Sequence, residues 1–162
     1  AIIYDPNYVR SYYNLAKIYH EKKKDTELAI SYLKEALKVD PDFADTYFLL
    51  AKLYKDRGQL KEAEEICDRL SKIYGLESTS HYNLGILYGE LASPKAIKEF
   101  NIAIQIDPEY APAYYNLAVS FAYLSPPKIE LARKHLDLAT KYGYKPDPKF
   151  LSYLEELEKK WR

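Results

Sequence analysis

The sequence is poor in several features that would point to particular classes of protein. It holds one cysteine, Cys67, which excludes an internal disulfide framework and a cysteine-rich zinc site. Its 24 basic and 24 acidic residues balance, which argues against a nucleic-acid partner and against a polybasic membrane anchor. No apolar run approaches the ~18 residues needed to cross a bilayer. We therefore expect no nucleic-acid partner and no membrane insertion.

The N-terminus has neither an initiating methionine nor the basic region and cleavage site of a signal peptide. We therefore expect residue 1 not to be the translated start, and the chain to be an excised or processed piece of a longer protein. Apolar residues make up 48% and charged residues 30%, which is the balance of a folded, soluble domain. Nothing in the sequence fixes the compartment, and a cytoplasmic location is slightly favoured.

Tyrosine is abundant, with 18 residues, and much of it falls in a repeated pattern. The first residues of four similar segments lie 35, 34 and 33 residues apart, at positions 12, 47, 81 and 114. A near-constant period of this length is typical of a helical repeat protein. The four segments are Tyr12–Ala16, Tyr47–Ala51, His81–Gly85 and Tyr114–Ala118.

A second helical pattern follows each segment, and turn residues separate the two. Apolar residues at three-and-four spacing, as in Leu28–Leu37, make one face of a helix. Asp25 is a predicted N-cap, and Gly58 suits a left-handed helix end. Ser93-Pro94 and Ser125-Pro126 are interpreted as an N-cap followed by proline at the first helical position. The predicted helices span roughly 8–22, 26–39, 44–57, 60–73, 78–91, 94–106, 111–124, 128–142 and 148–161.

This pattern resembles the tetratricopeptide repeat (TPR) over nearly the whole chain. The resemblance implies an all-α, right-handed superhelix of about four helical hairpins with a C-terminal capping helix. The family's small residues, which let two helices cross closely, match Ala16, Ala51, Gly85 and Ala118 in the first helices and Ala29, Ala63, Ala96 and Ala132 in the second helices.

The resemblance also implies a division of the chain. Residues 1–6 match the end of a preceding, truncated repeat. Residues 7–147 hold four repeats, and residues 148–162 form the cap that a solenoid needs at its end. The predicted repeats are 7–41, 42–75, 76–108 and 109–147. Because no such cap covers the other end, we expect the chain to self-associate through its N-terminal edge, near Ile2 and Ile3.

The family's groove-facing positions give a candidate peptide-binding surface. Asn14, Asn83 and Asn116 share one repeat position, where an amide can both donate to and accept from a peptide backbone. Aromatic side chains follow the same predicted groove. The candidate residues are Tyr13, Asn14, Lys17, Phe48, Lys52, Tyr82, Asn83, Ile86, Tyr115, Asn116, Val119 and Tyr123.

Two other interpretations of these residues stay open. Asparagine is common at this repeat position, and Leu49 interrupts the ladder. Many of the tyrosines are structural wedges between helices. The last two repeats are the more apolar, so we expect apolar or aromatic residues of a ligand to meet them.

The sequence is poor in catalytic groups. His20, His81 and His135 are far apart, Cys67 falls at a buried helical position, and no metal-ligand spacing occurs. We expect no enzymatic activity, no cofactor and no metal. The predicted function is a scaffold that presents a concave groove to an extended or helical peptide of a partner protein. The alternatives are a structural self-association element that builds an oligomer, and a regulatory TPR domain excised from a larger protein.

Overall fold

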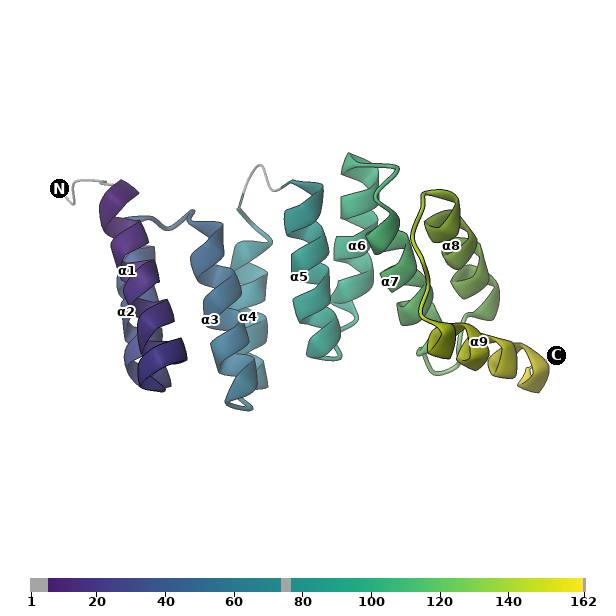
Figure 1. Cartoon of the computed structure of the whole chain (residues 1–162), viewed down its shortest axis with the longest axis horizontal. Coiled ribbons are helices and arrows are strands. Elements are labelled where there is room, and N and C mark those ends of the chain that lie inside the picture. Colours follow the sequence, from purple (N-terminus) through teal and green to yellow (C-terminus); the bar gives the residue numbers. More distant parts are fainter. Residues whose placement is uncertain (1–5, 74–76, 162) are drawn as a thin grey trace. The chain divides into compact units, whose positions relative to one another are not determined.

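The computed structural model describes residues 6–73 and 77–161, and all regular secondary structure in these ranges is helical. Within these described residues, nine α-helices and one π-helical turn, η1, follow one another (Figure 1). Their bounds are α1 Pro6–Ile18, η1 Tyr19–Lys23, α2 Thr26–Val39, α3 Ala44–Asp56, α4 Leu60–Leu70, α5 Ser78–Glu90, α6 Lys95–Ile106, α7 Ala111–Ala122, α8 Ile129–Lys141 and α9 Pro148–Lys160. The predicted helix ranges are confirmed to within a few residues. The predicted truncated repeat and the apolar edge at Ile2 and Ile3 lie outside the described residues.

The helices group into two compact units, Ala1–Tyr74 and Gly75–Arg162. The first unit holds the hairpins α1–α2 and α3–α4. The second holds the hairpins α5–α6 and α7–α8, followed by α9 (Figure 1). Within each unit, successive helices pack against one another, as α2 does on α3 and α6 on α7.

Small residues allow the two helices of every hairpin to cross closely. Ala16, Ala51 and Ala118 in the first helices are at most 1% exposed, and Gly85 occupies the same place in α5. The second helices bury alanine at their own crossing positions, with Ala29, Ala63, Ala96 and Ala132. The core of each hairpin therefore lies along this seam, as the repeat pattern predicts.

Turn chemistry fixes where several helices begin and end. Asp25 accepts a hydrogen bond from the backbone N–H of Leu28 at 3.0 Å, which confirms it as the N-cap of α2. Gly58 has a φ of 74° after α3, as predicted for a left-handed helix end. In the turn before α3, Asp40 accepts from the N–H of Asp42, and in the turn before α7, Asp107 accepts from the N–H of Glu109.

One of the two Ser-Pro interpretations is wrong. Helix α6 begins at Lys95, directly after Pro94, which already has helical backbone angles of φ −63° and ψ −12°. Helix α8 begins at Ile129, after Pro127, instead of at Pro126. The reason is that a residue before proline is disfavoured in the helical region, so Pro126, which precedes Pro127, cannot start a helix.

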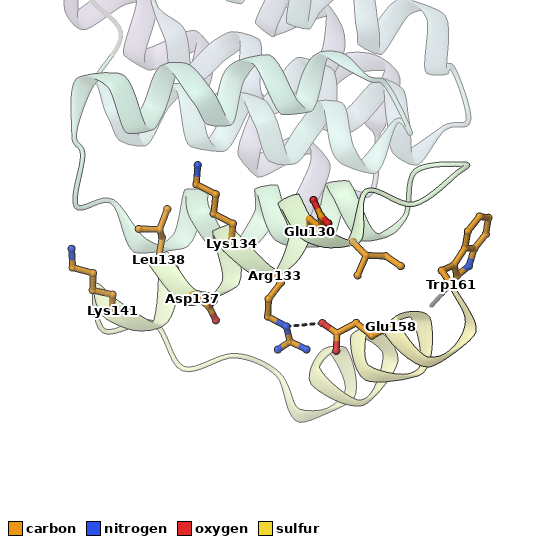
Figure 2. Close-up of a pocket in the computed structure, with 9 residues that line it drawn as sticks. Glu130, Arg133, Lys134, Asp137, Leu138, Lys141, Glu158 and Trp161 are labelled. Atoms are coloured by element: carbon orange, nitrogen blue, oxygen red, sulfur yellow. Dashed lines mark hydrogen bonds and ion pairs between the residues drawn. The ribbon is translucent and has the colours of Figure 1, made fainter.

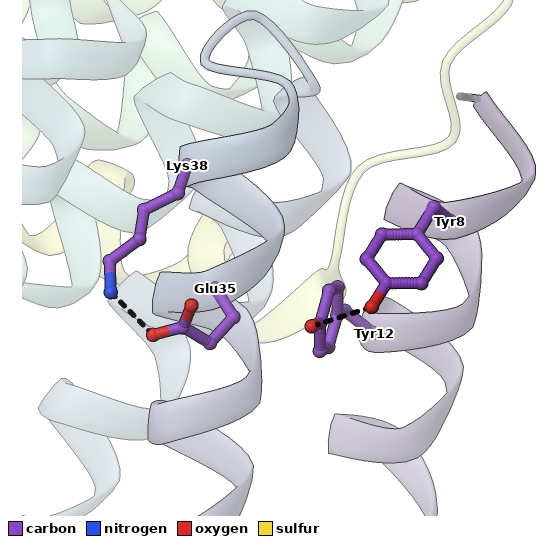
Figure 3. Close-up of polar contacts among 4 residues, drawn as sticks. All are labelled: Tyr8, Tyr12, Glu35 and Lys38. Atoms are coloured by element: carbon purple, nitrogen blue, oxygen red, sulfur yellow. Dashed lines mark hydrogen bonds and ion pairs between the residues drawn. The ribbon is translucent and has the colours of Figure 1, made fainter. Parts of the chain in front are cut away.

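The first hairpin carries an unusual feature, the π-turn η1 at the end of α1. The sequence spacing shows one extra residue in this repeat, and the wider turn over Tyr19–Lys23 lies in that stretch. On the surface of this hairpin, Tyr12 donates a hydrogen bond to Tyr8 at 3.3 Å, and Lys38 pairs with Glu35 on α2 (Figure 3).

Helix α9 packs against α7 and α8 through Phe150 and Leu154, which are 6% and 0% exposed. Asp147 caps its first turn by accepting from the N–H of Lys149. Trp161 is 55% exposed, because the helix ends at Lys160 and leaves the indole beyond its packed face. In the described part of the chain, the helices are too short and too polar to span a membrane.

Candidate functional site

A cavity of about 380 Å³ lies between α5 and α7 in the second unit. We call it the α5/α7 cavity. Five of its lining residues occupy groove-facing positions of the repeat, and three others complete the wall. The lining residues are Ile86, Gly89, Glu90, Phe100, Asn116, Val119, Ser120 and Tyr123. The structure thus brings together four of the predicted site residues, namely Ile86, Asn116, Val119 and Tyr123.

Phe100 reaches this cavity from α6 because Gly85 has no side chain. A Cβ placed at Gly85 would lie 2.5 Å from Cε1 of Phe100, which is closer than real carbon atoms approach. The phenyl ring fills that space and is 2% exposed. Gly85 is therefore a close-packing glycine, as the sequence predicted, and it allows an aromatic ring from the second helix to form part of the cavity wall.

Asn116 is held in place by two hydrogen bonds from its amide nitrogen. Nδ2 donates to the hydroxyl oxygen of Tyr82 at 3.2 Å and to the carbonyl oxygen of Pro112 at 3.1 Å. The donors of this side chain are thus used within the unit, and Oδ1 is the atom that it can offer to a ligand N–H. Ser120 lies one turn later and donates to the carbonyl of Asn116 at 2.7 Å. Asn83 is exposed on α5.

The predicted tyrosines of the second unit pack against other aromatic rings. Tyr82 contacts Tyr110 edge-on at 5.3 Å, and Tyr115 stacks on Tyr144 at 4.5 Å between ring centroids. Burial raises the pKa of the Tyr82 phenol, although the hydrogen bond from Asn116 opposes this, and burial also raises the pKa of Tyr115. Both hydroxyls therefore stay protonated at neutral pH.

Tyr123 differs from these two because its ring reaches solvent. It is 64% exposed at the C-terminal end of α7, and it stacks on Tyr153 of α9 with a centroid distance of 4.7 Å and an angle of 14°. One face of the ring is thus fixed by Tyr153, and the ring lines the α5/α7 cavity.

The predicted residues of the first unit lie on α1 and α3. Asn14, Lys17 and Lys52 are exposed, and Phe48 is half-buried. Tyr13 is half-buried, meets Phe43 edge-on at 5.7 Å, and has the ammonium of Lys17 5.9 Å from its ring centre. A cavity of about 440 Å³ in this unit contains none of them. It is lined by Pro41, Asp42, Tyr47, Arg69, Lys72 and Ile73.

Four residues of the α5/α7 cavity are not among the candidate residues. Glu90 lies at the C-terminal end of α5. Gly89 and Ser120 lie on the first helices but outside the family's groove-facing positions. Phe100 lies on a second helix, whereas the candidate residues lie on the first helices or, for Tyr123, at the end of one. A signal for Phe100 was present, because the pair Gly85 and Phe100 replaces an alanine and a smaller residue at the same two places in the other repeats.

A larger cleft, of about 790 Å³, lies between α8 and α9 and was not predicted. We call it the α8/α9 cleft. Figure 2 shows Arg133 reaching from α8 to Glu158 of α9, with 2.8 Å between Nε and Oε1, and Trp161 at the end of α9. The carboxylate of Glu158 raises the pKa of Arg133. The cleft is lined by Ile129, Glu130, Arg133, Lys134, Asp137, Leu138, Lys141, Glu158 and Trp161.

Two of the histidines and the cysteine are placed as structural residues. His81 Nδ1 lies 2.8 Å from Oε2 of Glu99, a carboxylate that is 2% exposed. His135 Nδ1 lies 2.8 Å from the carbonyl oxygen of Leu131, and Cys67 is buried. In the part of the chain that the structure describes, no three His, Cys, Asp or Glu side chains gather as a metal site.

Sequence and structure comparisons agree on the kind of repeat. Residues 21–79 match the tetratricopeptide repeat family. Solved TPR structures share the fold of the chain. The chain therefore resembles tetratricopeptide repeat proteins in the sequence of residues 21–79 and in its fold. Among curated proteins, none matches its sequence at a significant level.

Three solved structures are similar to this chain in fold, at low sequence identity. The C-terminal part of a TPR repeat-containing protein from Cytophaga hutchinsonii gives a TM-score of 0.72 at 20% identity, over 83% of this chain and 52% of that one. PilF of Pseudomonas aeruginosa gives 0.64 at 19% identity, over 88% and 64%. MamA gives 0.58 at 23% identity, over 96% and 81%. The chain thus spans about half of the Cytophaga structure, and the predicted all-α, TPR-like fold is confirmed.

The TPR family is generally a non-catalytic scaffold for protein–protein interaction, and the TPR-like fold of this chain suggests a role in protein–protein interaction.

Proposed function

We propose that the chain binds an extended or helical segment of a partner protein, and that the α5/α7 cavity receives an apolar side chain of that segment. The observation that carries the proposal is the cavity itself, which is formed where the groove-facing sides of two successive repeats meet. Its volume of about 380 Å³ falls within the range of small ligand pockets.

The chemistry of the cavity suits one apolar anchor flanked by backbone. Phe100, Ile86 and Val119 offer apolar surface, which favours a buried aliphatic or aromatic side chain. Asn116 presents a carbonyl oxygen at the edge, and that oxygen can accept a backbone N–H of the bound segment. A few buried anchors of this kind carry most of the energy in typical interfaces.

The tyrosines extend this surface beyond the cavity. Tyr123 is exposed on one face and braced by Tyr153 on the other, so it offers a flat ring at little entropic cost. In the first unit, Tyr13, Asn14, Lys17, Phe48 and Lys52 supply a more polar and basic surface, which suits a polar or acidic part of the partner. Asn83 and the ring-packed Tyr82 and Tyr115 complete the proposed set.

Selection of peptides on the full chain tests the proposal. A displayed library of random peptides is panned against the protein, and the affinity of the recovered peptides is measured for the wild type and for Val119→Glu. A carboxylate in the cavity opposes an apolar anchor, so we expect the dissociation constant to rise by about tenfold or more. Ile106→Glu is the matched control, because Ile106 is an apolar residue of the same unit that is 50% exposed and outside the cavity.

The recovered peptides are expected to share an apolar residue and to bind Ile106→Glu like the wild type. Peptides that bind Val119→Glu as tightly as the wild type, or a selection that yields no peptide, would contradict the proposed site.

A further inference from the structure

The α8/α9 cleft carries a regular row of charges on α8. Glu130, Lys134, Asp137 and Lys141 all line the cleft and are all exposed. They follow one another at spacings of four, three and four residues, which is the pattern of side chains that face a second helix along a seam. The charges along the row are negative, positive, negative and positive.

The charges of this row are complementary to those of the same row running in the opposite direction. A two-fold axis between residues 135 and 136 places Glu130 opposite Lys141 of a second copy, and Lys134 opposite its Asp137. In a two-fold contact each pairing occurs twice, so four oppositely charged pairs form across one axis. A parallel pairing of the same helices would place like charges opposite each other, which is unfavourable.

We propose that the α8/α9 cleft is the docking surface for a second copy of this chain, with the two α8 helices antiparallel. The occupant of each cleft is α8 of the other copy. The chain has a formal net charge of zero, so no overall repulsion opposes the approach of two copies.

The ion pair between α8 and α9 prepares the cleft for this contact. Glu158 holds Arg133 at 2.8 Å and neutralises it, so that the alternating row remains the dominant charge pattern of the α8 face. The same pair ties the cleft wall formed by α9 to α8 (Figure 2). Both walls are thus positioned before a second copy binds.

Apolar contact area comes from the end of the cleft where α8 begins. Trp161 is 55% exposed and lines the cleft together with Ile129, at the beginning of α8. A second cavity of about 420 Å³ adjoins the cleft at these two residues and at Glu130. In the antiparallel arrangement this end of the cleft meets the C-terminal end of the other α8, where Lys141 can lie against the indole face.

The contact is small, which predicts a weak dimer. Helix α8 has 13 residues and is therefore roughly 20 Å long. A contact of one helix and its flanks is smaller than a standard interface, and exposed ion pairs add little each. We expect a monomer–dimer equilibrium that becomes visible at about 10 to 500 µM protein, and that weakens with salt because the charges are exposed.

Sedimentation of the full chain across this concentration range tests the proposal. Lys134→Glu replaces two attractive pairs by two repulsive ones, because each pairing occurs twice in the dimer. We expect the dissociation constant of the dimer to rise by about tenfold or more. The double variant Lys134→Glu/Asp137→Lys restores opposite charges at both places and is expected to recover the affinity of the wild type.

Lys98→Glu, an exposed lysine of α6 outside the cleft, is the matched control and leaves the affinity unchanged. Circular dichroism verifies that each variant keeps its helix content. A wild type that stays monomeric over the whole range overturns the proposal, as does a dimer that Lys134→Glu weakens no more than Lys98→Glu. A double variant that fails to recover overturns the antiparallel register.

Discussion

The hairpin α5–α6 differs from the other three hairpins at the point where its helices cross. Each of the other hairpins pairs an alanine of the first helix with a residue no larger than leucine in the second. In α5–α6 the first helix has glycine and the second has phenylalanine. The pairs in chain order are Ala16 with Leu33, Ala51 with Cys67, Gly85 with Phe100, and Ala118 with Leu136.

The same hairpin also differs at the residue that begins each repeated segment. Tyr12 contacts Tyr32, and Tyr114 contacts His135, with ring centroids 6.3 Å and 6.2 Å apart. In α5–α6 the corresponding positions hold His81 and the buried Glu99, joined at 2.8 Å.

The two differences show that the repeat constrains pairs of residues more than single residues. The helix geometry survives because a loss of volume at Gly85 is offset by a gain at Phe100, and because a carboxylate in the core has a hydrogen-bond partner. The consequence is local, since the aromatic ring admitted by Gly85 becomes part of the α5/α7 cavity. Three predictions test this comparison.

Removal of the histidine should have the largest effect. His81→Ala leaves the carboxylate of Glu99 buried without its partner, and we expect the free energy of unfolding to fall by about 3 kcal/mol. Urea denaturation at neutral pH measures this change in the free energy of unfolding. The double variant His81→Tyr/Glu99→His copies the pair of the α7–α8 hairpin and should regain most of the loss. A single variant as stable as the wild type would show that Glu99 does not depend on His81.

Filling the space at Gly85 should have an intermediate effect. Gly85→Ala places a Cβ against the ring of Phe100, and we expect a net loss of about 1–2 kcal/mol in the free energy of unfolding after the gain in helix propensity. Adding Phe100→Leu recreates the pair of the other hairpins and should recover the loss caused by the clash. If the single variant is more stable than the wild type, the ring is free to move away and Gly85 is not a packing requirement.

Loss of a hydroxyl in the neighbouring hairpins should have the smallest effect. Tyr47 and Tyr114 donate hydrogen bonds at 2.7 Å and 3.1 Å to the carbonyls of Pro41 and Pro108. Tyr47→Phe and Tyr114→Phe remove these bonds, and each should cost about 1 kcal/mol in thermal or urea unfolding. Tyr153→Phe, at a half-buried position of α9 outside the turns, is the control for loss of a hydroxyl alone. Equal losses of stability in all three variants would show that the hydrogen bonds to the proline carbonyls contribute no more than an ordinary hydroxyl.

Much of the fold could be predicted because the signals are local and repeated. The spacing of Tyr12, Tyr47, His81 and Tyr114 located the hairpins, and Asp25 and Gly58 marked helix ends through backbone chemistry that acts over a few residues. Pro126 was misjudged although the rule that excludes it is also local, because the next residue, Pro127, decides its conformation.

The candidate site could be predicted only in part. Ile86, Asn116, Val119 and Tyr123 share a cavity because the repeat places them on facing sides of α5 and α7. Whether a given tyrosine faces solvent or another ring depends on segments that the repeat pattern does not describe. Tyr144, in the loop before α9, covers Tyr115, whereas Tyr153 supports Tyr123 and leaves it exposed.

The sequence by itself determined the repeat, the helices and the small residues at their crossings, since each depends on periodicity and on the local chemistry of turns. The tertiary structure decided which side chains meet. The hydrogen bonds of Asn116, the partner of Glu99, the entry of Phe100 beside Gly85 and the cleft between α8 and α9 all depend on contacts between residues that lie many positions apart in the chain. Such contacts are set by packing in three dimensions, and helical periodicity along the chain does not contain them.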